Sequence, residues 1–456
     1  MTSMHAWNAE AEAFSHAVIG YATERLRLPK DPRWSACPAP TLTAALAHAV
    51  TPTGAGAHEA LRLFREVLMP ACRPMDDPMN LAYVPTAPTV AATMFDLVVS
   101  SASIFAGNWE AGAGAIAAEN QALRWLADLA GLPATAGGVF VSGGSAANLS
   151  ALVTARAEYT RRHGRPQRFA VVVTAEVHAS VRAAARVMDI DTVVVSLDER
   201  GRMTGSALQH VLTAHGGDGV FAVVATAGTT NAGAIDELDA IADICAARGL
   251  WLHVDGAYGL AALCSPTGRE RLRGIACVDS FGVDPHKWLF APYDCAALIY
   301  RQPDIAAAAH AQHGDYLDAI DRGEWNPSDY AYHLSRRARG LPLWFSVVTY
   351  GTQAYSDAID VSLDSAAAFA DEVARRDGFT LILRPQLSVV LFTRTGWNRD
   401  HYLEWSRQRA REGAFLVVPT SWKGAPCLRI CLIHPRTERS ALFAILDDLE
   451  NFRSSP

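Results

Sequence analysis

The sequence predicts an α/β protein with a large, mostly parallel sheet domain covered by helices and a smaller C-terminal α/β domain. From Val139 onward, short runs rich in β-branched residues alternate with alanine-rich stretches of helical character. These runs are apolar throughout, which is typical of parallel strands buried on both faces. The chain has 456 residues, of which 50% are hydrophobic and 19% charged, so it can bury more than one large core.

Residues 1–78 form the first predicted unit, in which helices are broken by proline-rich connections. Such a stretch has too few apolar residues for a core of its own. We therefore expect it to pack against the main body or against a second subunit.

Residues 79–345 form the predicted large domain. It begins with an extended, proline-bounded segment, Asn80–Thr86, and continues with helices over about 89–105 and 115–130. The strands expected after them are the runs VFVS, FAVVVT, TVVVSL, VFAVVAT, WLHVDG, SFGV and CAALIY.

One motif in this domain is misleading. Residues Gly112–Ala117 match the GxGxxA form of the dinucleotide-binding fingerprint, which requires a preceding strand. Asn108-Trp109-Glu110 does not have the character of a strand, so we do not expect a dinucleotide site here.

Residues 346–456 form the predicted C-terminal domain. A long helix runs through Ala370 and leads into a second, smaller α/β pattern. We expect strands near 380–383, 388–393, 414–418 and 427–432, and helices over 399–411 and 436–452.

Composition excludes several classes of function. The net charge of −7 and the lack of a basic tail argue against a nucleic-acid-binding protein. The eight cysteines are scattered, and Cys427 and Cys431 flank a strand-like segment with no second ligand pair, so no metal site is expected. The N-terminus lacks a signal peptide, and no apolar stretch reaches the roughly 18 residues of a membrane span. We expect a soluble, cytoplasmic protein.

Lys287 is the most unusual residue, because it lies in the apolar segment Val283–Leu289. Burying an ammonium group is costly unless the group is neutralised or made covalent. A lysine that forms a Schiff base with an aldehyde cofactor meets both conditions. A lysine at a strand end whose ammonium reaches the surface is the alternative, and this segment alone leaves both open.

Polar residues follow the other predicted strands, at the sheet edge where α/β proteins bind ligands. Gly143-Gly144-Ser145 opens a helix and offers N–H groups to a phosphate, or else forms a turn with Ser145 as N-cap. His178 could stack on a flat ring or be an ordinary residue of a first helical turn. Asp255 ends a strand and needs a cationic partner, unless it is structural. The small-residue loop Ala227–Asp236 would let a ligand approach the backbone.

Together these features match pyridoxal phosphate. Its phosphate needs N–H donors, its ring a stacking partner, its aldehyde a lysine, and its pyridine nitrogen a carboxylate. No metal ion or dinucleotide requires the whole set.

The sequence resembles the pyridoxal-phosphate-dependent group II amino acid decarboxylases, which include the aromatic-L-amino-acid, glutamate and histidine decarboxylases. The resemblance covers roughly residues 75 to 450. It implies fold type I, with a seven-stranded large domain, a small C-terminal domain and a homodimer whose active sites lie at the interface. The motifs that carry it are Tyr83–Thr86, Glu119 with Trp125-Leu126, Gly137–Phe140, His178–Ser180, Ala225–Thr230, His253–Tyr258, Asp279–Phe281 with Asp284–Trp288, Arg336–Arg339 through Trp344-Phe345, and Leu428–Ile430 ahead of His434–Thr437.

The resemblance also implies roles by position. Lys287 would form the Schiff base, Asp255 would pair with the pyridine nitrogen, and His178 would stack on the ring. Further cofactor contacts would be Gly144, Ser145, Thr230, Ala257 and His286. The substrate-binding residues would be Tyr83, Thr86, Phe105 and Gly107, with Thr86 facing the carboxylate. The implied reaction converts an L-amino acid to its amine and carbon dioxide through a quinonoid.

The first departure from the family concerns the proton donor. In animal and plant members a mobile loop carries a tyrosine that protonates the quinonoid, and that position here is Pro327. Tyr330 and Tyr332 lie close by and are the candidate catalytic residues. Members that lack the tyrosine convert the carbanion with oxygen into an aldehyde, ammonia and peroxide, so this reaction stays open, although His178 favours plain decarboxylation.

The second departure concerns the substrate pocket. Aromatic-specific relatives have a bulky aromatic residue two positions before the tryptophan equivalent to Trp109, and here that residue is Gly107. Either the pocket is roomier or Phe105 fills the space. No obvious arginine is available for a side-chain carboxylate, so an aromatic or bulky apolar substrate is favoured. Another fold type I lyase or transferase, with Arg429 binding the substrate carboxylate, is the remaining alternative.

Overall fold

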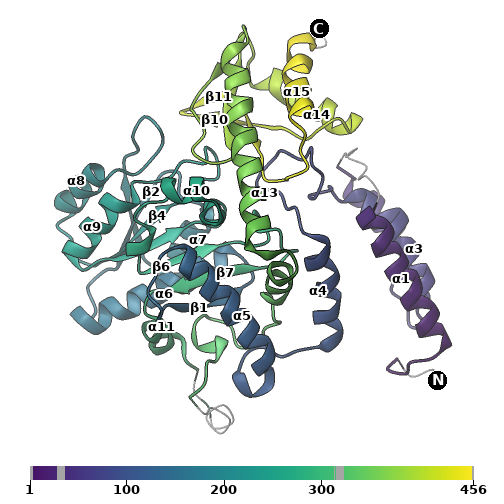
Figure 1. Ribbon diagram of the computed structural model, residues 1–456, viewed down its shortest axis with the longest axis horizontal. Coiled ribbons are helices and arrows are strands. Elements are labelled where there is room, and N and C mark those ends of the chain that lie inside the picture. Colours follow the sequence, from purple (N-terminus) through teal and green to yellow (C-terminus); the bar gives the residue numbers. More distant parts are fainter. Residues whose placement is uncertain (1–3, 28–35, 313, 315–322, 454–456) are drawn as a thin grey trace.

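The computed structural model describes residues 4–27, 36–312, 314 and 323–453, and its centre is a seven-stranded sheet (Figure 1). The strand order is β1-β7-β6-β5-β4-β2-β3. Six strands run parallel, and β7 is antiparallel to both of its neighbours, so the expected mostly parallel sheet is confirmed. The strands are β1 (Gly137–Val141), β2 (Ala170–Thr174), β3 (Asp191–Val195), β4 (Val220–Thr226), β5 (Trp251–Asp255), β6 (Ser280–Val283) and β7 (Ala296–Tyr300).

Helices cover both faces of this sheet, because the central strands are apolar on both sides. One core lies under α5, α8 and α9, and a second lies under α6, α7 and α11. These helices are α5 (Trp109–Leu129), α6 (Gly144–His163), α7 (Ala179–Met188), α8 (Gly205–His215), α9 (Leu238–Arg248) and α11 (Pro303–His310), and the short α10 covers Pro266–Arg271.

The C-terminal part contains a four-stranded antiparallel sheet in the order β10-β11-β9-β8. The expected strand at 414–418 is wrong, because β10 begins only at Val418. Leu416 instead forms an isolated bridge to Asn80, and its neighbours pack into the core. The elements are β8 (Phe379–Leu381), β9 (Val389–Arg394), α14 (Arg399–Glu412), β10 (Val418–Trp422), β11 (Ala425–Cys431) and α15 (Arg439–Asn451).

Helix α13 (Leu341–Arg375) joins the two sheets (Figure 1). It contacts α4 (Val90–Ala102) and α5 in the large domain, and β8, β9 and α15 in the C-terminal part. The boundary expected between residues 345 and 346 therefore lies inside a helix. Gly351, with φ 77°, interrupts the helical backbone and kinks α13.

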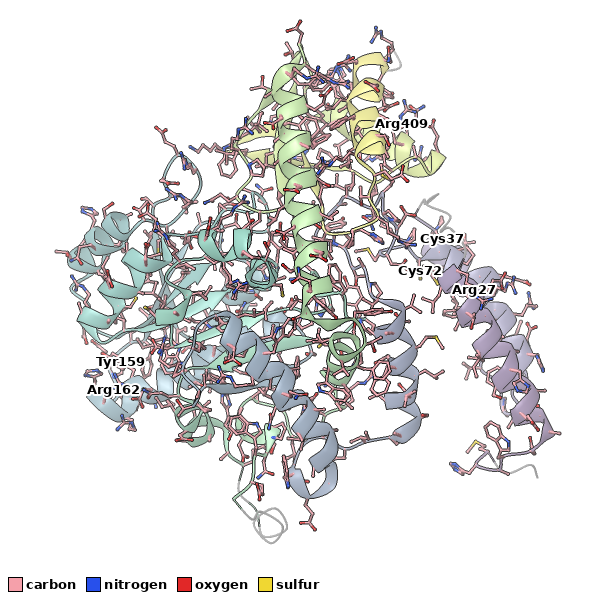
Figure 2. All side chains as sticks on the ribbon, in the orientation of Figure 1. Arg27, Cys37, Cys72, Tyr159, Arg162 and Arg409 are labelled. Carbon is pink, nitrogen blue, oxygen red and sulfur yellow. The ribbon has the colours of Figure 1, made fainter. Side chains whose placement is uncertain are left out.

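The N-terminal helices α1 (Ala9–Arg27), α2 (Ala39–Ala45) and α3 (Ala57–Leu63) contain no buried residue in this chain. Figure 1 shows α1 and α3 side by side, separated from the sheet by α4. In Figure 2, the labels Arg27, Cys37 and Cys72 mark this projecting segment. None of the described helices is long and apolar enough to cross a membrane.

Candidate active site

The candidate site lies at the edge of the large sheet where the parallel strands end. Five of the six parallel strands, β1, β2, β4, β5 and β6, end beside a segment that the sequence singled out. These strands lie in one sheet, so their carboxyl ends face the same edge. The segments begin at Gly143, Val177, Ala227, Asp255 and Asp284.

Lys287 lies in a tight turn after β6. Its backbone N–H donates to Asp284 O over 2.9 Å, and the next residue, Trp288, is fully buried and stacks on Tyr258 at 5.2 Å. The Lys287 side chain is 23% exposed, and Nζ lies 2.8 Å from Asp284 Oδ2. Burial alone would lower the pKa of Lys287, but the Asp284 carboxylate outweighs it and raises the pKa. Lys287 is therefore a largely enclosed ammonium with a single close counter-ion.

The start of α6 forms an anion-binding turn. The N-cap is Gly143 and has no side-chain cap, so the alternative N-cap role of Ser145 is wrong. A Cβ at Gly144 would lie 3.1 Å from Ala257 Cβ and 3.2 Å from Asp284 Oδ2, so a side chain there would meet both. Ser145 is exposed, and the N–H groups of a first helical turn lack helical partners.

His286 lies beside this turn. Its Nδ1 accepts the backbone N–H of Cys295 over 3.0 Å, and its Nε2 lies 3.5 Å from Asp284 Oδ2. Burial lowers the pKa of His286, so the ring is neutral and carries its proton on Nε2. Backbone N–H groups and one imidazole N–H are the donors that a phosphate needs.

Asp255 ends β5 and is 5% exposed. Its carboxylate accepts a hydrogen bond from Asn148 Nδ2 over 2.9 Å and from the backbone N–H of Ala257 over 3.2 Å. A buried carboxylate whose donors among the described residues are neutral suits a cationic ligand atom, such as a protonated pyridine nitrogen. Asn148 was not among the predicted site residues, although it lies only four residues after Gly144.

His178 is the N-cap of α7, and its side chain is exposed. Its Nδ1 lies 2.7 Å from Ser180 Oγ and also accepts the Ser180 backbone N–H over 3.2 Å. The residue is thus a helix-capping histidine, as the alternative proposed. Its exposed ring at the sheet edge also leaves it available for stacking.

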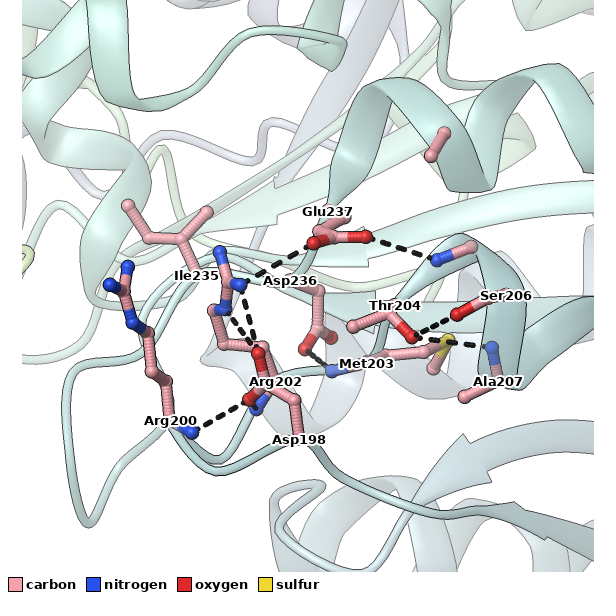
Figure 3. A network of polar contacts seen from close by, with 12 residues as sticks. Asp198, Arg200, Arg202, Met203, Thr204, Ser206, Ala207, Ile235, Asp236 and Glu237 are labelled. Carbon is pink, nitrogen blue, oxygen red and sulfur yellow. Dashed lines mark hydrogen bonds and ion pairs between the residues drawn. The ribbon is translucent and has the colours of Figure 1, made fainter.

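The loop that carries Thr230 is anchored at its base by Asp236 (Figure 3). Asp236 accepts the backbone N–H groups of Met203 over 2.6 Å and of Thr226 over 2.7 Å. Burial raises the pKa of Asp236 to about 7 despite these two donors. Thr230 itself is exposed at the tip of the loop.

Arg429 lies on β11 in the C-terminal sheet, and its side chain contacts this loop of the large sheet domain. It is buried, its Nε donates to Thr230 O over 2.9 Å, and its Nη1 donates to Tyr83 O. Its Nη2 is buried and has no hydrogen-bond partner among the described residues. Arg429 was expected to have a role only in the alternative enzyme class, and the structure brings it to the loop of the candidate site.

The four predicted substrate residues form two groups. Tyr83 is half-exposed, and the buried Thr86 Oγ1 lacks a hydrogen-bond partner among the described residues. Phe105 and Gly107 lie together, since two ring atoms of Phe105 are 2.5 and 2.8 Å from the position of a Gly107 Cβ. Phe105 thus fills the space that the missing side chain leaves.

Within this chain, the structure places Tyr330 away from the candidate site. Tyr330 is 7% exposed, stacks on Trp325 at 4.1 Å, and accepts a hydrogen bond from Tyr300 at its carbonyl over 3.1 Å. Tyr300 pairs with Gly137, the first residue of β1, so this contact lies at the opposite edge of the sheet. Tyr332 is 55% exposed. The described residues also contain no group of three or more metal-ligating side chains.

Comparison with known proteins identifies close similarities over most of the chain. Residues 46–395 match the family model described as the pyridoxal-dependent decarboxylase conserved domain. An aromatic-L-amino-acid decarboxylase of Bacillus atrophaeus is 31% identical over 88% of this chain and 86% of its own. An L-2,4-diaminobutyrate decarboxylase of Rhizobium meliloti is 33% identical over 81% and 77%. The crystal structure of Oryza sativa TDC with PLP and tryptamine superposes with a TM-score of 0.90 over 98% of each chain, at 24% identity.

Proposed function

The chain belongs to the pyridoxal-dependent decarboxylase family, and from that premise we propose that it decarboxylates an aromatic or bulky apolar L-amino acid to the amine. It is a carboxy-lyase, and its cofactor is pyridoxal phosphate. The cofactor, when bound, supplies an aldehyde and a ring that takes up the electrons released when carbon dioxide leaves. The observation that supports the proposal is the convergence of Lys287, Asp255, His178 and Gly144 on one sheet edge.

Each of these residues has a task that its surroundings support. The N–H groups after Gly143 and the Nε2–H of His286 would hold the phosphate. The Asp255 carboxylate, oriented by Asn148, would face the pyridine nitrogen and favour its protonated form. Lys287 must lose a proton before its amine can react with the aldehyde, and the Asp284 carboxylate at 2.8 Å, which stabilises the ammonium, opposes that loss until the cofactor is bound.

The choice of substrate rests on Thr86 and on Phe105. The buried Thr86 hydroxyl, which has no hydrogen-bond partner among the described residues, suits the α-carboxylate of the substrate, and Phe105, which fills the space beside Gly107, would provide an apolar wall. The Bacillus relative supports an aromatic side chain. One observation favours a second candidate, an acidic side chain: Arg429 Nη2, which is buried and has no hydrogen-bond partner in the described part of the chain, could pair with a carboxylate or sulfinate.

We further propose a homodimer in which residues 1–78 pack on the partner. The support is that α1, α2 and α3 bury no residue within their own chain. Tyr330 also lies at the far edge of its own sheet, and only Tyr332 is exposed. A tyrosine of this loop that protonates the substrate carbon would therefore be Tyr332, acting at the partner's site.

The test is a screen of the purified holoenzyme. The twenty common L-amino acids, aromatic analogues, 2,4-diaminobutyrate and cysteine sulfinate are supplied one at a time, and carbon dioxide, amine and peroxide are measured. We expect equal amounts of carbon dioxide and amine from an aromatic substrate, and no product from Lys287→Ala. Peroxide without amine would replace the proposed reaction with oxidative deamination to the aldehyde, and turnover confined to acidic substrates would favour the second candidate.

A further inference from the structure

A continuous path of hydrogen bonds lies beneath the candidate site and connects the strands β5 and β6 to the helices α6 and α7. Its links measure 2.9 Å from Trp251 Nε1 to Ser280 Oγ, 2.9 Å from Ser280 Oγ to His253 Nδ1, and 2.9 Å from His253 Nε2 to Asn148 Oδ1. From Asn148 Nδ2 it branches over 2.9 Å to Asp255 Oδ2 and over 2.9 Å to Ser180 Oγ. Ser180 Oγ then lies 2.7 Å from His178 Nδ1.

The donor and acceptor at each link follow from the residue types. The ionised carboxylate of Asp255 can only accept, so the amide of Asn148 must turn its NH₂ group toward it. The oxygen of Asn148 then faces His253, whose Nε2 must carry a proton to donate to it. Ser280 accepts from Trp251, an obligate donor, and directs its own proton to His253 Nδ1. Burial lowers the pKa of His253 to about 4, which agrees with a neutral ring.

The second branch reaches the exposed imidazole. Asn148 uses its other amide hydrogen on Ser180 Oγ, so the hydroxyl proton of Ser180 points to His178 Nδ1. That nitrogen also accepts the backbone N–H of Ser180 over 3.2 Å. A ring nitrogen with two donors aimed at it keeps its lone pair, and the single proton of His178 is therefore on Nε2.

We propose that Asn148 is a positioning residue that sets the tautomer of His178, that is, which ring nitrogen carries the proton of the neutral ring, while it orients Asp255. His178 thereby presents an N–H donor, and not a basic nitrogen, at the sheet edge. A bound carboxylate can accept from that N–H, whereas proton abstraction by the exposed nitrogen is excluded. The positions of the cofactor and substrate in this inference rest on the proposed function. The direction of each hydrogen bond does not, because it is fixed by residues of the chain.

The decisive variant is Asn148→Asp, which keeps the size of the side chain and replaces its NH₂ donor with an acceptor. Ser180 would then turn its hydroxyl proton to the new carboxylate, and His178 Nδ1 would be free to bind a proton. Asn398→Asp is the matched control, because Asn398 caps α14 and an aspartate accepts the same backbone N–H groups. It makes the same chemical change far from the candidate site.

The measurement is ring ¹⁵N NMR of the holoenzyme labelled at histidine, with His178 assigned by its loss in His178→Gln. At about pH 8, where an imidazole is neutral, we expect the wild type and Asn398→Asp to show a pyridine-type Nδ1 and a pyrrole-type Nε2 in His178, since two donors face Nδ1. In Asn148→Asp at the same pH, the Nδ1 signal should shift toward the pyrrole-type, protonated value. A protonated Nδ1 in the wild type, or an unchanged pattern in Asn148→Asp, would overturn the inference.

Ser180→Ala separates the two branches. It removes the hydroxyl that faces His178 and leaves the Asn148–Asp255 contact in place. We expect Ser180→Ala to change the His178 spectrum and to leave the dissociation constant of pyridoxal phosphate within about twofold of the wild-type value. Asn148→Asp should raise that constant about tenfold, because an ionic hydrogen bond to Asp255 is lost. If the His178 spectrum stayed unchanged in both Ser180→Ala and Asn148→Asp, whatever happened to the cofactor affinity, the branch from Asn148 through Ser180 to His178 would be refuted. These readouts do not need turnover, so an error in the proposed substrate leaves them valid.

Discussion

Glu119→Gln is expected to destabilise the protein strongly, because it breaks a fully buried ion pair. Glu119 on α5 and Arg336 are 2% and 0% exposed, and the guanidinium donates to both carboxylate oxygens over 2.7 and 2.9 Å. The same carboxylate accepts the Gly340 N–H over 2.8 Å. Glutamine would retain one acceptor oxygen, but its NH₂ group would face an N–H of Arg336. The buried guanidinium of Arg336 would then face one neutral amide oxygen in place of a carboxylate. We expect a loss of about 3 kcal/mol in the free energy of unfolding, the lower end of the range for broken buried ion pairs.

The assay is urea unfolding of the holoenzyme at one protein concentration, followed by tryptophan fluorescence. Asp189→Asn is the control, because Asp189 also accepts from a guanidinium at both carboxylate oxygens, that of Arg168, but on the exposed surface, where solvent screens the pair. Arg336→Met alone should also destabilise, yet the same change made on top of Glu119→Leu should restore stability by removing the unpaired charge. A destabilisation by Glu119→Gln no larger than that by Asp189→Asn, or the same effect of Arg336→Met in both backgrounds, would contradict this expectation.

Three further predictions concern the site. Asp284→Asn should lower the pKa of Lys287, because it removes the carboxylate that stabilises the ammonium. The reaction of Lys287 with added pyridoxal phosphate can be followed by visible absorbance. As the pH is raised, the rate of this reaction should begin to increase at a lower pH in Asp284→Asn than in the wild type. Gly144→Ala should weaken cofactor binding about tenfold or more, by filling the anion-binding turn, whereas Gly114→Ala, with open space around its Cβ, should bind normally in the same titration. Burial lowers the pKa of His253 from 6.5 to about 4, so on acidification the unfolded chain takes up a proton at this residue before the folded chain does. The free energy of unfolding should therefore fall by up to about 3 kcal/mol between pH 6.5 and pH 4. Urea unfolding at pH 7 and at pH 5 should show this loss in the wild type and not in His253→Gln.

The sequence predicted the parallel sheet and the residues at its carboxyl edge because both depend on local patterns. Apolar runs identify buried strands, and a ligand-binding residue directly after a strand needs no knowledge of distant contacts. The predicted start of α5, at residue 115, was wrong, because the glycines at 112 and 114 obscure the helical pattern. The helix begins at Trp109, and the side chain of its N-cap Asn108 accepts the Ala111 N–H. The strand expected at 414–418 failed for a similar reason: an apolar run alone does not distinguish a strand from a core-packed connection.

Contacts between distant segments were beyond the reach of these patterns. Nothing in the local sequence shows that Asn148 meets both Asp255 and His253, which lie more than 100 residues away. Tyr330 was a reasonable candidate from its position near Pro327, and only the structure shows that its carbonyl accepts from Tyr300 at the far edge of the sheet. Such pairings depend on the strand order, which the sequence did not supply.

The two sheets divide the proposed chemistry between them. Residues that would hold the cofactor follow strands of the large sheet, whereas Arg429, from the C-terminal sheet, contacts both the Thr230 loop and Tyr83. The hydroxyl of Tyr258 also accepts the backbone N–H of Ser388 over 2.8 Å, and this bond joins the strand β5 segment to the C-terminal part. A shift of the C-terminal sheet would therefore move Arg429, and with it the backbone of Tyr83 and the Thr230 loop. Under the proposed function, Arg429 and Tyr83 are for this reason the first positions to vary when the specificity of this chain is studied.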